Sequence, residues 1–216
     1  MSPSLNKLQE SSPRLLLAGG DLVNEHAASH NGPAYSSYAR ELLSELATQL
    51  GMHCPPALWS ARGHGKPTHP GLHSGWYANI THKKGRVVVG LADRCFGIDL
   101  EYAAARRTAR LDALIDQLPE PWVRQRIREA DSRVSAFYQS WTLYESLFKH
   151  ASHTPHPAEN LFAMRLHTLA ERRLDCAVWQ GDQWTLALVS EGRMSPHPNP
   201  ATLFPGLQPT RVFILD

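Results

Sequence analysis

Two acidic side chains two positions apart are the first residues in this sequence whose types and spacing suggest chemistry. Asp99 and Glu101 lie in the segment FGIDLE, residues 96–101. Side chains alternate along a strand, so the two carboxylates point to one side while Ile98 and Leu100 point to the other, into a core. Neighbouring carboxylates repel unless a cation lies between them, and Mg²⁺ prefers oxygen ligands. The pair predicts a magnesium site, although a solvated strand face has the same short pattern.

A second group, Glu145 and Lys149, follows on a predicted helix over residues 132–150. Apolar side chains recur in it at steps of three and four, the pattern of a buried helix: Val134, Phe137, Trp141, Tyr144 and Phe148. One helical turn separates Glu145 from Lys149, so both project from the same side and can meet a metal ion and a phosphate together. Exposed pairs of this kind are also common, and each contributes only about 0.3–0.5 kcal/mol.

Four segments, taken together and in this order, resemble the motifs of the larger, single-chain 4′-phosphopantetheinyl transferases. Residues 65–67 (GKP) match the G-K-P of that family, and residues 79–82 (NITH) match its N-[IVL]-S-H. Residues 97–101 (GIDLE) match G-[IV]-D-[IL]-E, and residues 141–149 (WTLYESLFK) match W-[ST]-x-K-E-[AS]-x-x-K. The resemblance covers residues 36–150, about half of the chain.

The resemblance implies an enzyme that transfers the 4′-phosphopantetheine group of coenzyme A to a serine of an apo carrier protein, releasing 3′,5′-ADP. In this reading Asp99, Glu101 and Glu145 bind Mg²⁺, for which Mn²⁺ can substitute. Glu145, directly or through a water, accepts the serine proton, and Lys149 contacts the pyrophosphate. Both count as catalytic residues.

Coenzyme A itself is expected to contact residues from several of these segments. They are Arg40, Arg62, His64, Gly65, Lys66, Pro67, Thr81 and His82, together with Asp99 and Lys149. Arg40 is equally typical of a helix surface, and His82 is also typical of a turn.

The sequence departs from the family at three places. Tyr144 replaces the first lysine of the helix motif and removes a cation from the expected metal site. Residues 150–153 (HASH) replace a turn that contains glycine, and no Lys or Arg lies between Arg14 and Arg40. These departures bear on affinity and rate more than on the reaction class.

Two other functions remain open. The first is a relative that only binds carrier proteins; it would keep the fold but has no physical reason to keep three repelling carboxylates. The second is a Mg²⁺-dependent hydrolase of nucleotide diphosphates, which would need no carrier protein. For the transferase, the partner is an acyl or peptidyl carrier protein or carrier domain of fatty acid, polyketide or nonribosomal peptide synthesis. The sequence does not say which.

The elements that position these residues indicate an α+β fold. We expect strands over residues 14–23, 76–80, 86–92, 95–101, 161–167, 174–179, 183–190 and 211–215. Helices are expected over 36–50, 111–118, 122–128 and 132–150, the second after an Ala- and Arg-rich segment at 102–110. Residues 86–92 and 95–101 are expected to form a hairpin. The family implies two similar subdomains, residues 1–102 and 103–216, related by a pseudo-twofold axis, with the cofactor site in the cleft between them.

Composition restricts the other possibilities. The 216 residues are 42% hydrophobic with a net charge of +2, which indicates a globular chain without the basic excess of a nucleic-acid binder. We expect a cytoplasmic location, because no signal peptide or membrane-spanning run is evident, and we expect a monomer. Residues 1–13 are expected to be disordered or loosely tethered. No disulfide framework is indicated by the three cysteines, Cys54, Cys95 and Cys176, which are odd in number and far apart. No zinc site is indicated by the spacing of four clustered histidines, His64, His69, His73 and His82.

Overall fold

The structure is a computed structural model of the whole chain, and it describes residues 14–22, 32–63 and 65–212. The segment expected to be disordered, residues 1–13, and the candidate residue His64 lie outside the described residues.

The described chain forms two four-stranded sheets, which confirms the α+β class. The first sheet has the order β2-β3-β1-β7 and the second the order β4-β6-β5-β8. All neighbouring strands are antiparallel except β1 and β7. The strands are β1 (Arg14–Asp21), β2 (Tyr77–Lys83), β3 (Arg86–Ala92), β4 (Phe96–Tyr102), β5 (Leu174–Gly181), β6 (Trp184–Glu191), β7 (Ser195–His197) and β8 (Gln208–Thr210).

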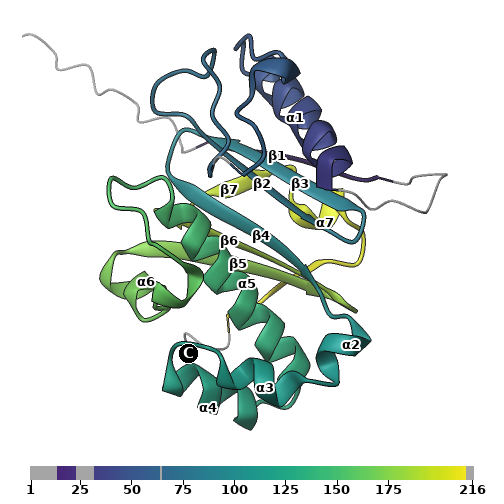
Figure 1. Cartoon of the computed structure of the whole chain (residues 1–216), viewed down its shortest axis with the longest axis vertical. Helices are drawn as coiled ribbons and strands as arrows, with labels where there is room; N and C mark the ends of the chain where they lie inside the picture. Colours follow the sequence, from purple (N-terminus) through teal and green to yellow (C-terminus); the bar gives the residue numbers. More distant parts are fainter. Residues whose placement is uncertain (1–13, 23–31, 64, 213–216) are drawn as a thin grey trace, which may run out of the picture.

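A long helix packs against each sheet (Figure 1). Helix α1 (Gly32–Gln49) covers the first sheet, and its apolar side chains Ala39, Leu43 and Leu46 are buried. Helix α5 (Arg133–Ala151) lies across β4 and β6. The short helices are η1 (Pro56–Leu58), α2 (Ala105–Thr108), α3 (Leu111–Asp116), α4 (Pro121–Glu129), η2 (Leu161–Ala163), α6 (Thr168–Glu171) and α7 (Pro200–Leu203).

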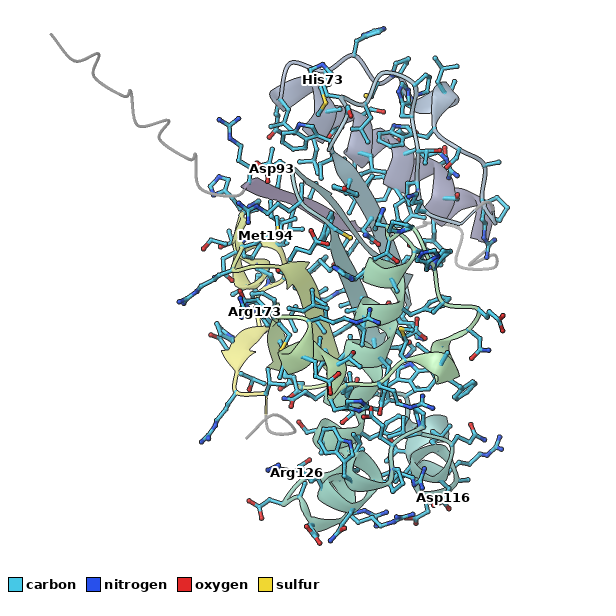
Figure 2. The ribbon with its side chains drawn as sticks, turned by 90° about the vertical axis from the view of Figure 1, so that its left-hand side faces the viewer. His73, Asp93, Asp116, Arg126, Arg173 and Met194 are labelled. Carbon is cyan, nitrogen blue, oxygen red and sulfur yellow. The ribbon has the colours of Figure 1, made fainter. Side chains whose placement is uncertain are left out.

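The molecule is elongated, with the two ends formed by different segments. In the turned view, His73 lies near one end, and Asp116 and Arg126 of α3 and α4 lie near the other (Figure 2). A buried apolar cluster joins the two sheets between these ends, and it contains Leu17 of β1 as well as Ile98 of β4.

Several expectations about elements are wrong. Strands β3 and β4 form no hairpin, because β3 pairs with β1 and β2 while β4 pairs with β6. Residues 161–167 contain a short 3-10 helix instead of a strand. The last strand of the described residues is Gln208–Thr210; most of the strand expected over residues 211–215 lies outside the described residues, because 213–215 are not described. Helix α1 begins at Gly32, four residues earlier than the helix expected over residues 36–50.

Side chains of β2 connect the two sheets at the edge of β4. Asn79 Nδ2 donates a hydrogen bond to the carbonyl oxygen of Phe96 (2.7 Å), and the Leu100 amide donates one to Thr81 Oγ1 (3.0 Å). These bonds satisfy backbone groups on the side of β4 that faces away from β6. The two strands that carry the predicted motifs therefore lie side by side.

Candidate active site

The carboxylates of Asp99 and Glu101 are buried on β4, with only 4% and 5% of each residue exposed. Ile98 and Leu100 are fully buried as well and belong to the apolar cluster between the sheets, as expected for the core side of the strand. Buried carboxylates need partners, and each of the two has a lysine.

Lys149 Nζ donates to Asp99 Oδ1 at 2.7 Å and to the carbonyl oxygen of Ile98 at 3.1 Å. The Thr81 hydroxyl also donates to Asp99 Oδ1, at 3.0 Å. The other oxygen, Asp99 Oδ2, is buried without a hydrogen-bond partner among the described residues. An unpartnered buried carboxylate oxygen is costly, and a bound cation would satisfy it.

The second lysine, Lys83, was not identified as a site residue from the sequence. Its Nζ lies 2.7 Å from Glu101 Oε1. The alternation of β2 could have identified Lys83, because it lies two positions after Thr81 and so shares its face toward β4. Two lysines, not one, therefore contribute positive charge beside these carboxylates.

Glu145 of α5 completes an acidic cluster with Asp99 and Glu101. Burial and the negative charge of Asp99 raise the pKa of the Glu145 carboxyl to about 7; Glu101 adds to this rise, while Lys149 and Lys83 oppose it. The helix approaches β4 very closely at Gly97, where an added Cβ would lie 1.9 Å from the carbonyl oxygen of Ser146. Glycine in the GIDLE segment is thus needed for this contact.

The three carboxylates do not converge tightly in the described structure. Among the described residues, the ligand atoms that lie within 4.8 Å of one another belong to Cys95, His150 and Glu191 instead. Asp99 and Glu101 are each bonded to a lysine instead, Asp99 to Lys149 and Glu101 to Lys83. The donor set of three carboxylates, with Asp99 Oδ2 unpartnered, still fits a hard divalent cation such as Mg²⁺.

A pocket of about 330 Å³ lies next to this cluster, and Lys149 belongs to both. Most of the predicted coenzyme A residues line it: Arg40, Arg62, Gly65, Lys66, Pro67, His82 and Lys149. They come from α1, from the loop after η1, from β2 and from α5. The pocket is rich in positive charge, because four of these residues are Arg or Lys, which suits a phosphate-bearing ligand.

Arg40 holds the loop of residues 59–68 against α1. Its Nε donates to the carbonyl oxygen of Ser60 (3.1 Å), and its Nη1 donates to that of Ser36 (2.7 Å). Ser60 and Thr68 close the loop, since each backbone amide bonds an oxygen of the other residue. Gly65 has a φ of 78°, which favours glycine at this turn.

Thr81 and His82 point in opposite directions from β2. His82 lines the pocket and stacks on Tyr35, with ring centroids 5.1 Å apart. Burial lowers its pKa, and the positive charges of Lys149, Arg62 and Lys83 lower it further. The Thr81 hydroxyl instead bonds Asp99 and the Leu100 amide, and Thr81 does not line the pocket.

Two expectations about α5 need correction. Tyr144 does not stand beside the carboxylates: it is buried, and its hydroxyl donates to Glu120 Oε2 at 2.7 Å. Phe148, expected on the core face, lines the pocket with Lys149. The single apolar stripe was misleading because α5 is buried on most of its surface.

None of the available models of protein families matches this sequence, and no curated protein is significantly similar to it. None of the helices in the described part of the chain combines the length and the apolar character needed to cross a membrane.

Proposed function

We propose that this protein transfers the 4′-phosphopantetheine group of coenzyme A to a serine of an apo carrier protein. One observation carries the proposal: a cation-lined pocket shares Lys149 with two buried carboxylates, Asp99 and Glu101, whose negative charges raise the pKa of the nearby Glu145. Phosphoryl transfer needs cationic donors for the phosphates, a place for a divalent ion and a group that accepts a proton. The residues named by the sequence resemblance supply all three.

In the proposed reaction the serine hydroxyl oxygen attacks the phosphorus that carries the pantetheine arm. A new P–O bond forms to serine, the phosphoanhydride bond breaks, and 3′,5′-ADP leaves. Glu145 accepts the serine proton, directly or through a water, and its raised pKa suits a base near neutral pH. Lys149 Nζ releases its hydrogen bond to Asp99 and donates one to a pyrophosphate oxygen instead.

The pocket residues would bind the nucleotide half of coenzyme A. Arg62 and Lys66 offer charge-assisted donors to phosphate groups, while Arg40 keeps the loop in place. Neutral His82 adds a hydrogen-bonding ring. We assign Thr81 a positioning role on Asp99 instead of a phosphate contact.

Asp99, Glu101 and Glu145 are the residues that would hold Mg²⁺. When bound, such an ion would neutralise the charge of the pyrophosphate and of the leaving group. The carboxylates would bind it only if Lys83 and Lys149 loosen their present bonds.

We further infer that the chain contains two similar subdomains, one around each sheet, that share one apolar cluster and have the site between them. Each sheet carries one long helix, which supports this view. The pocket draws its lining from α1, the following loop and β2 on one side and from α5 on the other.

The test is to mix the protein with coenzyme A, Mg²⁺ and an apo carrier protein, and to measure the mass of the carrier. A mass increase equal to phosphopantetheine, with release of 3′,5′-ADP, is expected. Asp99→Asn should abolish transfer while the circular dichroism spectrum stays native, whereas the exposed strand residue Asp175→Asn should have no effect. Transfer that persists in Asp99→Asn, or in the presence of a chelator, would refute the metal assignment.

The same assay separates the two alternatives. A hydrolase would release 3′,5′-ADP from coenzyme A without any carrier protein. A binding module would retain the carrier but release no nucleotide.

A further inference from the structure

A second cluster of potential metal ligands lies outside the proposed active site. It consists of Cys95, just before β4, His150, in the last turn of α5, and Glu191, at the end of β6. One ligand atom from each residue lies within 4.8 Å of those of the other two. These residues are far apart in the sequence, so no spacing pattern could indicate the site.

His150 provides the second, independent observation. Only 2% of the residue is exposed, yet neither Nδ1 nor Nε2 has a hydrogen-bond partner among the described residues. A buried imidazole without any partner is costly. A ligand on one ring nitrogen would remove part of this cost.

An ion pair between His150 and Glu191 does not explain the arrangement. Their closest atoms, Nε2 and Oε1, are 4.0 Å apart. Burial lowers the pKa of His150 to about 4, and the nearby charge of Arg172 lowers it further. The imidazole is therefore neutral near pH 7 and offers a lone pair.

The other two residues complement the imidazole. The Cys95 thiol is buried and donates only a long hydrogen bond, 3.4 Å, to the carbonyl oxygen of His150. The Glu191 side chain is 56% exposed, so an ion can enter from solvent along it. Sulfur, nitrogen and carboxylate oxygen are together the ligands that Zn²⁺ takes, whereas Mg²⁺ takes oxygen alone.

We propose that Cys95, His150 and Glu191 bind a Zn²⁺-class transition-metal ion, with water as the fourth ligand. On binding, the sulfur–metal bond replaces the S–H bond, and the thiol proton passes to solvent. His150 is neutral before binding, so the thiol is the source of the one proton released for each ion bound. The ion joins β4, β6 and α5 one residue away from Lys149 and therefore stabilises the packing that positions the proposed site.

The experiment uses the full chain after treatment with a chelator. Zn²⁺ is titrated in competition with a chromophoric chelator to obtain stoichiometry and affinity, and Co²⁺ serves as a spectroscopic probe. We expect one equivalent of Zn²⁺ to bind, release of about one proton per ion, and a thiolate-to-cobalt charge-transfer band. The midpoint temperature of thermal unfolding should rise when Zn²⁺ is added, because the ion binds the folded state.

The variants identify the ligands. Cys95→Ser should lose the charge-transfer band. Cys176→Ser should keep it, because Cys176 is a partly buried cysteine outside the cluster. Glu191→Gln should weaken Zn²⁺ binding by at least about tenfold, since even outer-shell partners are worth that much. Asp99→Asn should keep the band, which separates this site from the carboxylate cluster.

The outcomes decide the proposal. Absence of stoichiometric Zn²⁺ binding, a cobalt spectrum without the sulfur band, or unchanged binding in both Cys95→Ser and Glu191→Gln would overturn it. If Cys95→Ser fails to fold, the exposed position of Glu191 makes Glu191→Gln the deciding variant.

Discussion

Lys83 and Lys149 act on different carboxylates and should therefore have different effects when removed. Lys149 bonds Asp99 and also lines the pocket, whereas Lys83 bonds Glu101 and does not line the pocket. In the proposed reaction only Lys149 contacts the pyrophosphate. Variants of the two lysines can therefore distinguish two effects: stabilisation of the carboxylates without substrate, and contact with the substrate.

We predict that Lys149→Ala lowers kcat by about 10²-fold or more, because a donor to the developing charge is lost. Lys149→Arg should also be poorly active, since a planar fork replaces a compact ammonium. Lys83→Ala should alter the Mg²⁺ dependence but leave the KM for coenzyme A nearly unchanged. Steady-state kinetics of the three variants tests this, and wild-type kinetics in Lys149→Ala would contradict the assignment.

The sequence was informative at this scale wherever a motif fixed a residue type. The resemblance named Asp99, Glu145 and Lys149, and the structure brings these side chains together. It could not indicate that Tyr144 points away to Glu120, because the direction of a side chain on a buried helix depends on its neighbours in space. Whether the named residues carry the proposed roles stays a prediction.

At the scale of elements, the contact between α5 and β4 places Glu145 and Lys149 beside the strand carboxylates. A Cβ at Gly97 would lie 1.9 Å from the carbonyl oxygen of Ser146 and 2.5 Å from the amide nitrogen of His150. Both neighbours are helix backbone and cannot move independently. Position 97 therefore sets how closely α5 approaches β4.

We predict that Gly97→Ala lowers the free energy of unfolding by about 1–3 kcal/mol and also reduces transfer activity, because the helix must move away. Gly51→Ala is the control. Gly51 has a φ of 75° but open space around an added Cβ, so the substitution should lower the free energy of unfolding only through backbone strain and leave activity unchanged. Urea unfolding and the carrier assay measure both effects. Equal behaviour of the two variants would argue against a steric role for Gly97.

The network around Glu120 attaches α4 and the segment before α6 to α5. Its carboxylate accepts hydrogen bonds from Tyr144 and Trp122, and His167 Nδ1 lies 2.7 Å from it. Burial would raise the pKa of Glu120, but these bonds and that from the Leu166 amide lower it below its ordinary value of 4.5. The ionised form is therefore favoured by folding.

We predict that this contribution to stability is fully present above pH 4.5 and is lost as the pH falls through the lower pKa of the folded state. Glu120→Gln should unfold at lower urea than wild type near neutral pH, and the difference should shrink in acid. Glu129→Gln, at the exposed last residue of α4, is the control. A difference that does not change with pH would contradict the linkage.

Elements were predicted from sequence more reliably than their pairing. The patterns located α5, β3 and β6 within one residue or so, because periodicity and alternation are local properties. The short connection between β3 and β4 favoured a hairpin, yet the chain crosses to the second sheet there. Partner choice depends on burial of both faces in the whole fold, which a local pattern does not contain.

At the scale of the whole molecule, the two sheets share one apolar cluster. It includes Leu15 and Val88 from the first sheet and Leu100, Leu186 and Leu188 from the second. Strand β7, from near the end of the chain, pairs with β1. The expected division near residue 102 therefore cuts through shared core and leaves β4 without its partner β6.

We predict that the protein unfolds in a single cooperative transition, although chains longer than about 150 residues often do not. Calorimetry should give a van't Hoff enthalpy close to the calorimetric one. A fragment of residues 1–102 should not fold alone, because it would expose Ile98 and Leu100 and leave the edge of β4 unpaired. Two resolved transitions, or a fragment with native-like near-UV circular dichroism, would instead mean that each half keeps an independent core and that the site forms where two separately stable units meet.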